Sequence, residues 1–166
     1  METTKNKTTL LIMAAGMGSR FGSLKQLALL GPHKKTLLHY SIYDAVHAGF
    51  DKIVFIIRRS FENEFKEAVG KYAESLVETV YCFQEMDQLP GNLPPIQREK
   101  PWGTAHAIWA AKDHIHEPFI AINADDFYGR DAFVKMHDFV ASNPDERCFS
   151  LAGYQLAATL SENGTV

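Results

Sequence analysis

The chain has 166 residues, of which 46% are hydrophobic and 22% charged, and its formal net charge is -3. This length favours a single domain, and this composition is typical of a folded globular protein rather than a disordered one. The mixed and slightly acidic charge argues against a generic nucleic-acid-binding protein, which usually carries a basic excess or a basic stripe.

Short apolar runs alternate with amphipathic segments along the chain. Runs without a polar face are typical of buried parallel strands, and apolar residues at helical spacing indicate helices. In chain order we expect strand 8–14, helix 36–47 with a stop at Gly49, strand 52–57, helix 62–72, strand 76–83, a proline-rich loop 89–101, helix 104–114, strand 118–123, helix 131–141 and strand 147–152. This order predicts a three-layer α/β/α fold with an open, mostly parallel sheet and helices on both faces.

The two ends of the chain carry different signals. Residues 1–9 are polar, and the apolar stretch 10–15 is too short for a signal-peptide core or a membrane span. We therefore expect a cytoplasmic protein without membrane association. Asn163–Gly164 is a strong hairpin-turn signal, but only two residues follow it. We therefore expect residues 1–166 to form one domain, truncated at the C-terminus relative to a longer protein.

The cysteines and histidines give no sign of a metal centre. Cys82 and Cys148 are too few and too distant for a disulfide framework or a zinc site, and their apolar surroundings predict reduced, buried thiols. His114 and His116 lie close together, but no third ligand has suitable spacing. We expect them to be favoured by the helix dipole at a helix end.

The strongest functional signal follows the first predicted strand, where residues 14–26 read AAGMGSRFGSLKQ. Glycines let backbone N–H groups turn inward around an anion, and Arg20 and Lys25 add cationic donors. The third glycine comes one place late for the dinucleotide-binding fingerprint, and no register produces a P-loop. The segment is therefore expected to be a phosphate-binding loop of another type, because a plain glycine-rich turn would not explain Arg20 and Lys25.

This loop resembles the signature of the sugar-1-phosphate nucleotidylyltransferases, L-A-A-G-x-G-x-R followed by a lysine. The chain matches it with LIMAAGMGSR at residues 11–20 and Lys-Gln-Leu at residues 25–27, with leucine where many members have proline before the lysine. The resemblance implies the Rossmann-like nucleotide-diphospho-sugar transferase fold. It also implies catalytic roles for Arg20 and Lys25, and nucleotide binding by Ala14, Ala15, Gly16, Gly18 and Gln26.

A second motif, KPWGTAHA at residues 100–107, resembles the family's L-G-T-A/G-x-A element, which packs against the base and ribose. By this match Gly103 would permit close approach to a flat ring, and Thr104 would bind nucleotide and cap the helix. Without the first motif, a simple helix cap after a glycine turn would explain these residues. Family members often place a base-reading glutamine upstream, and Gln97 is the nearest, one place out of register. The nucleobase therefore stays open.

A third motif, AINADDFYG at residues 121–129, resembles the family's G-D-x-x-x-G segment. By this match Asp125 is the ligand of a Mg²⁺ cofactor, which favours one or two carboxylates together with phosphate oxygens and water. Asp126 is either a second ligand or a cap for the following turn.

The resemblance implies a magnesium-dependent enzyme that transfers a nucleotidyl group from an NTP to a sugar 1-phosphate, forming an NDP-sugar and pyrophosphate without an enzyme-bound intermediate. Two alternatives stay open: a cytidylyltransferase acting on an alcohol phosphate such as phosphocholine, and a non-catalytic nucleotide-binding regulatory domain. The expected partners are the NTP and the sugar phosphate, with no nucleic acid and no membrane, and homo-oligomerisation is neither favoured nor excluded.

Overall fold

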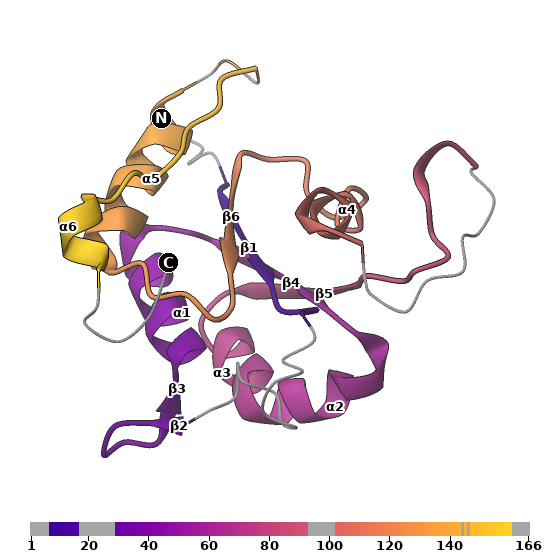
Figure 1. Ribbon diagram of the computed structural model, residues 1–166, viewed down its shortest axis with the longest axis horizontal. Coiled ribbons are helices and arrows are strands. Elements are labelled where there is room, and N and C mark those ends of the chain that lie inside the picture. Colours follow the sequence, from indigo (N-terminus) through magenta and orange to yellow (C-terminus); the bar gives the residue numbers. More distant parts are fainter. Residues whose placement is uncertain (1–6, 17–28, 93–101, 144, 146, 161–166) are drawn as a thin grey trace, which may run out of the picture.

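The structure is a computed structural model that describes residues 7–16, 29–92, 102–143, 145 and 147–160. Its centre is a parallel sheet in the order β5-β4-β1-β6, with strands β1 (Thr9–Met13), β4 (Lys52–Ile57), β5 (Glu78–Phe83) and β6 (Phe119–Asn123) (Figure 1). These four strands confirm the strands expected at residues 8–14, 52–57, 76–83 and 118–123. A short antiparallel hairpin of β2 (Leu29–Leu30) and β3 (Lys35–Thr36) was not expected.

The central strands are apolar on both faces, which is why their sequences show no polar side. All six residues of β4 are buried, and so are Thr9 to Ile12 of β1. Successive side chains of a strand point to opposite faces. An all-apolar strand is therefore stable only when both faces of the sheet are covered.

Helices form in all four segments where the periodicity predicts them, although the third ends at Trp109 instead of residue 114, and the short last helix was not predicted. They are α1 (Leu37–Ala48), the short segments α2 (Glu62–Phe65) and α3 (Lys71–Glu74) joined by a π-helical turn (Lys66–Gly70), α4 (Thr104–Trp109), α5 (Arg130–Ser142) and α6 (Leu156–Thr159). α1 ends at Gly49, whose φ of 117° is left-handed and whose N–H donates to the carbonyl oxygens of Ala45 and Val46. This confirms the predicted stop, since glycine adopts that conformation without strain. No helix of the described ranges is long and apolar enough to cross a bilayer.

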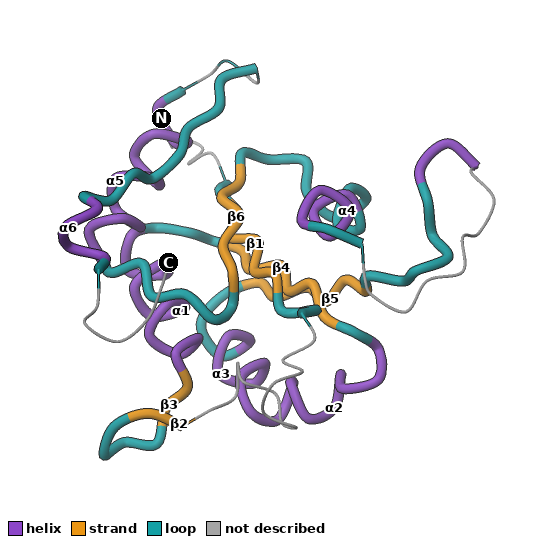
Figure 2. Tube along the Cα trace, in the orientation of Figure 1, coloured by secondary structure: helices purple, strands orange, loops and turns teal. Residues whose placement is uncertain are grey.

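Two buried clusters cover the two faces of the sheet. Leu10, Ile12 and Phe55 pack with side chains of α1, α2 and α5, whereas Leu11, Val54 and Ile56 pack with α4. Figure 2 shows α4 on one side of the strands and α1 and α3 on the other. The alternation along β1 and β4 therefore builds the three-layer architecture that the sequence predicts.

The predicted fifth strand over residues 147–152 is wrong. This segment contains no strand in the described chain, and the side chains of Phe149 and Leu151 are 90% and 96% exposed. A strand forms only when a neighbouring strand accepts its backbone hydrogen bonds, and this segment has no such partner there. Cys148 is consequently exposed, against expectation, whereas Cys82 on β5 is buried as expected. The hairpin signal at Asn163–Gly164 lies outside the described residues.

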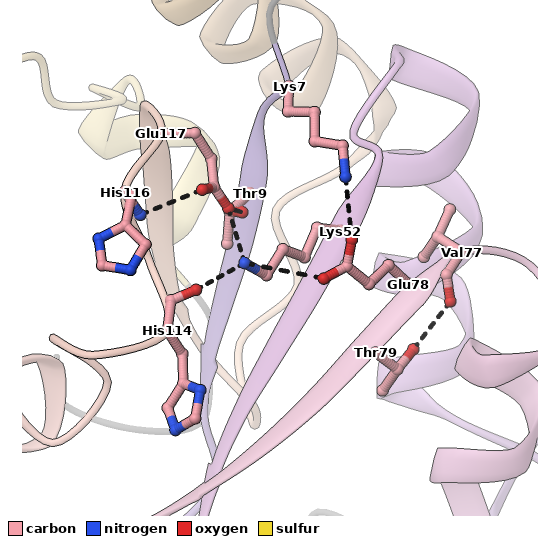
Figure 3. Close-up of polar contacts among 9 residues, drawn as sticks. All are labelled: Lys7, Thr9, Lys52, Val77, Glu78, Thr79, His114, His116 and Glu117. Atoms are coloured by element: carbon pink, nitrogen blue, oxygen red, sulfur yellow. Dashed lines mark hydrogen bonds and ion pairs between the residues drawn. The ribbon is translucent and has the colours of Figure 1, made fainter.

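Charged side chains join the amino ends of the strands, on the edge opposite their carboxyl ends. The ammonium Nζ of Lys52 lies 3.0 Å from Oε1 of Glu117 and donates to the carbonyl oxygen of His114 at 2.5 Å (Figure 3). Glu117 also accepts a hydrogen bond from the hydroxyl of Thr9, and Glu78 lies 3.9 Å from Lys52. These contacts connect β1, β4 and β5 to the segment that leads into β6.

Glu117 is ionised by this environment in spite of its burial. Burial opposes ionisation and raises its pKa, but the hydrogen bonds from Thr9, Lys52 and the backbone of His116, together with the Lys52 charge, lower the pKa from 4.5 to about 2. The amino edge of the sheet is thus occupied by a compact ion pair.

Candidate functional site

The order of the strands reverses at β1. The chain runs outward from β1 through β4 to β5 and then returns to place β6 on the other side of β1. The backbone N–H of Ala14 donates to Ile56 at 2.8 Å, and that of Ala124 donates to Met13 at 3.1 Å. The segments that follow β1 and β6 therefore leave the sheet at the same carboxyl edge, where open α/β sheets bind their ligands.

The first segment at this edge begins with small residues. Ala14 and Ala15 are buried, and Ala15 packs in one cluster with Ala107 of α4 and with Ala111, which follows that helix. Small side chains here let α4 lie close to the end of β1. Gly16, the next residue, is exposed. The beginning of the predicted phosphate loop is thus at the expected place.

The remaining residues predicted for this loop, Gly18, Arg20, Lys25 and Gln26, lie outside the described residues, as does Gln97. Their predicted roles in catalysis and in nucleotide binding stay predictions.

Gly103 begins α4, whose N-terminal end lies at this edge. Its carbonyl oxygen accepts hydrogen bonds from the N–H groups of His106 and Ala107, so Gly103 is the N-cap. The expectation that Thr104 caps the helix is wrong, because Thr104 is already the first helical residue. A Cβ added to Gly103 would meet nothing within 4 Å, and its φ of -68° suits any residue. Neither packing nor backbone conformation requires glycine here, which supports an open space in front of it.

Gln84 was not singled out from the sequence, although it follows β5 directly at the same edge. It is only 8% exposed, and its Nε2 donates to the carbonyl oxygen of Trp102 at 2.9 Å. Nε2 also lies 3.2 Å from Nδ1 of His106. This amide therefore connects the end of β5 to the segment that precedes Gly103. A polar residue immediately after an apolar run was the sequence signal that could have identified it.

Two further contacts fix this junction. Nε2 of His106 lies 2.6 Å from the carbonyl oxygen of Gln88, and the indole N–H of Trp102 donates to Met86 at 3.0 Å. Since a carbonyl can only accept, Nε2 of His106 carries the hydrogen and Nδ1 accepts from Gln84. Trp102 and His106 are thus hydrogen-bonded to the backbone of the loop after β5.

The segment after β6 carries two adjacent aspartates in different surroundings. The side chain of Asp126 accepts hydrogen bonds from Nδ2 of Asn123 at 2.8 Å and from the hydroxyl of Tyr128 at 3.4 Å. Asp125 is exposed and, within the described ranges, makes no hydrogen bond or ion pair. The two carboxylates, equivalent in the sequence, are therefore distinct in the structure.

Asp125 fits the position of a magnesium ligand. It offers a hard oxygen donor at the carboxyl edge of the sheet, beside the strand that leads into the glycine loop. Among the described residues, no group of three or more His, Cys, Asp or Glu side chains is placed to hold a metal ion. A cation at Asp125 would then take its other ligands from phosphate oxygens and water, which is the usual arrangement for Mg²⁺.

Comparison with known proteins gives consistent sequence relatives. The family model described as nucleotidyl transferase matches residues 9–160. A UTP–glucose-1-phosphate uridylyltransferase of Bacillus subtilis is 28% identical over 130 residues, covering 70% of this chain and 43% of that protein. The bifunctional protein GlmU of Staphylococcus haemolyticus is 30% identical over 107 residues, covering 64% and 19%. The chain thus spans less than half the length of these curated relatives.

Solved structures share the fold. A UDP-glucose pyrophosphorylase complexed with UDP-glucose superposes with a TM-score of 0.54 at 22% identity, over 80% of this chain and 52% of that one. Rv0371c of Mycobacterium tuberculosis superposes with a TM-score of 0.56 at 19% identity, over 84% and 62%. These similarities confirm the predicted fold class.

Proposed function

This chain belongs to the nucleotidyl transferase family, and we propose that its protein transfers a nucleotidyl group from an NTP to a sugar 1-phosphate, forming an NDP-sugar and pyrophosphate. The observation that carries the proposal is the convergence of Gly16 and Asp125 at the carboxyl ends of two adjacent strands. It joins the start of a glycine-rich loop to a carboxylate that makes no hydrogen bond or ion pair with another described residue. The named relatives that act on glucose 1-phosphate or UDP-glucose support this class of reaction.

In the proposed reaction, a phosphate oxygen of the sugar 1-phosphate attacks the α-phosphorus in line. The bond from the α-phosphorus to the bridging oxygen breaks, and pyrophosphate leaves. Such a transfer depends mainly on positioning and on the stabilisation of charge. Arg20 and the loop N–H groups would hold the β- and γ-phosphates, and Lys25 would neutralise charge at the α-phosphate.

Asp125 would hold the divalent cation against the phosphate oxygens. When bound, Mg²⁺ supplies neutralisation of the phosphate charge that develops during transfer. The nucleoside would lie against Gly16 and Gly103, where the second of these glycines has open space before it.

Gln84 lies next to the Trp102–Gly103 segment at this edge and is a second candidate for reading the nucleobase. Both N–H bonds of its amide are directed to acceptors, the Trp102 carbonyl and Nδ1 of His106. The remaining group is Oε1, an acceptor, for which no hydrogen bond is found in the described part of the chain. An acceptor suits the imide N–H of uracil or thymine, whereas cytosine, whose N3 carries no hydrogen, offers it only the exocyclic amino group.

A substrate screen on the full-length protein tests the proposal. Each of UTP, dTTP, CTP, ATP and GTP is combined with glucose 1-phosphate or phosphocholine, and pyrophosphate release is measured with Mg²⁺ present. We expect release with UTP or dTTP and the sugar phosphate. Release only with CTP and phosphocholine would instead identify a cytidylyltransferase. NTP binding by calorimetry without turnover on any acceptor would indicate a regulatory domain.

A further inference from the structure

The turn after β6 contains a hydrogen-bond network that surrounds Asp125 without including it. The members are Asn123, Asp126 and Tyr128, and all three lie within five residues of the end of the strand. Nδ2 of Asn123 donates to Asp126, and the backbone N–H of Asn123 donates to the hydroxyl of Tyr128 at 2.9 Å. The network therefore closes the turn back onto the strand that begins it.

The backbone contact explains why a tyrosine occupies this turn. The N–H of Ala124 points toward β1, where it bonds Met13, so the N–H of Asn123 points to the free edge of β6. In the described chain no strand lies at that edge. The Tyr128 hydroxyl oxygen accepts the hydrogen bond from this N–H, which the backbone of a neighbouring strand would otherwise accept. The same hydroxyl donates its hydrogen to Asp126.

Tyr128 is itself held from two sides. Its ring meets that of Phe133 edge-on, with ring centroids 6.2 Å apart, and Phe133 is buried. Its backbone carbonyl accepts a hydrogen bond from the hydroxyl of Tyr154 at 2.9 Å. A side chain anchored in this way can define the course of the turn, because its own position is set by the core and by the segment before α6.

We propose that Asp126 and Tyr128 are positioning residues that fix the turn after β6, so that the carboxylate of Asp125 alone is offered to the divalent cation. This inference rests on the proposed function, in which Asp125 holds the metal. It assigns the two neighbouring aspartates different tasks. Asp125 binds the cation, whereas Asp126 orients the turn and is not a second ligand.

Calorimetry on the full-length protein separates these tasks. The affinity for UTP is measured with Mn²⁺ and again with EDTA. The affinity with Mn²⁺ divided by the affinity with EDTA reports the contribution of the metal. Removing a group that orients a metal ligand typically weakens metal binding by 10- to 100-fold. We expect Tyr128→Phe and Asp126→Ala each to lower the ratio about tenfold, with the metal-free affinity unchanged.

Asp126→Asn is the informative conservative variant. Its amide oxygen can still accept from Asn123 and Tyr128, but it lacks the charge of a metal ligand. The ratio should therefore stay near that of the unaltered protein. A loss as large as that of Asp126→Ala would make Asp126 a ligand and overturn the positioning role. Tyr40→Phe serves as the matched control, since Tyr40 is partly exposed on α1 and its hydroxyl makes no hydrogen bond to another described residue.

The outcomes distinguish this inference from the proposed function. If Asp125→Asn lowers the ratio but Tyr128→Phe and Asp126→Ala do not, the inference is wrong and the metal assignment stands. If the unaltered protein shows no difference between Mn²⁺ and EDTA, both are wrong. Thermal unfolding without metal accompanies each variant. A lower midpoint with an unchanged ratio would assign Tyr128 a structural role only and would also contradict the inference.

Discussion

Replacing Glu117 by glutamine should destabilise the protein by an amount that depends on pH. The substitution keeps the size of the side chain but removes the charge that pairs with Lys52. The pKa of Glu117 is lowered from 4.5 to about 2. At about 1.4 kcal/mol per pKa unit, this difference corresponds to about 3 kcal/mol of folding free energy at pH 7. The side chain is only 17% exposed, so solvent screening reduces this figure little.

The sign of the pH dependence follows from linkage. A carboxyl group whose pKa is lower in the folded state contributes its full stabilisation above the unfolded pKa of 4.5. That contribution decreases as the pH falls below 4.5 and is nearly lost at the folded value of about 2. The free energies of unfolding of the unaltered protein and Glu117→Gln should therefore differ by about 3 kcal/mol at pH 7 and by about 1 kcal/mol at pH 3.

Urea unfolding at pH 7, 5, 4 and 3 measures this difference directly. Glu78→Gln is the control, because Glu78 lies farther from Lys52, at 3.9 Å, and its side chain is 49% exposed. Exposed pairs of this kind contribute about 0–1 kcal/mol. A Glu117→Gln difference that is small at pH 7, or that stays constant on acidification, would refute the assignment of a buried, ionised Glu117.

Four further predictions concern the site and its frame. Lys25→Ala should lower turnover of the full-length protein by roughly two to three powers of ten, and a near-normal rate would remove its proposed role. Gly103→Asn should weaken NTP binding in calorimetry, because its side chain would enter the open space. It should not lower the unfolding midpoint, because asparagine is a good N-cap. Unchanged binding would contradict a ligand at this position. Gly49→Ala should lower stability by about 1–3 kcal/mol in urea unfolding, since φ is 117° and an added Cβ would lie 2.8 Å from the His137 ring; an unchanged midpoint would contradict this. Gln84→Leu should reduce the preference for UTP or dTTP over CTP in the substrate screen, and an unaltered preference would remove Gln84 as the base reader.

Local patterns were sufficient for most of the architecture. Apolar runs without a polar face predicted β1, β4 and β6, and the stop at Gly49 predicted the end of α1. These signals act within a few residues and depend on backbone sterics and on which faces are buried, so the sequence carries them directly. The family resemblance was likewise visible in three short motifs, and the family match over residues 9–160 confirms it.

Other properties depended on neighbours that are distant in the sequence. Residues 147–152 have the composition of a strand, but a strand also requires a partner to receive its hydrogen bonds, and none accompanies it in the described chain. Gln84 became a candidate only when the fold brought it within 2.9 Å of Trp102, eighteen residues away.

The two adjacent aspartates show, within one motif, the difference between what the sequence determines and what the fold determines. The sequence by itself determined that a carboxylate follows β6 at the edge of the sheet where ligands bind. It did not determine which of Asp125 and Asp126 is available. The tertiary structure decided this, because Asp126 accepts hydrogen bonds from Asn123 and Tyr128, whereas Asp125 makes none with another described residue. Periodicity and motif spacing place a residue on an element, but only the packed fold determines which polar atoms are already satisfied.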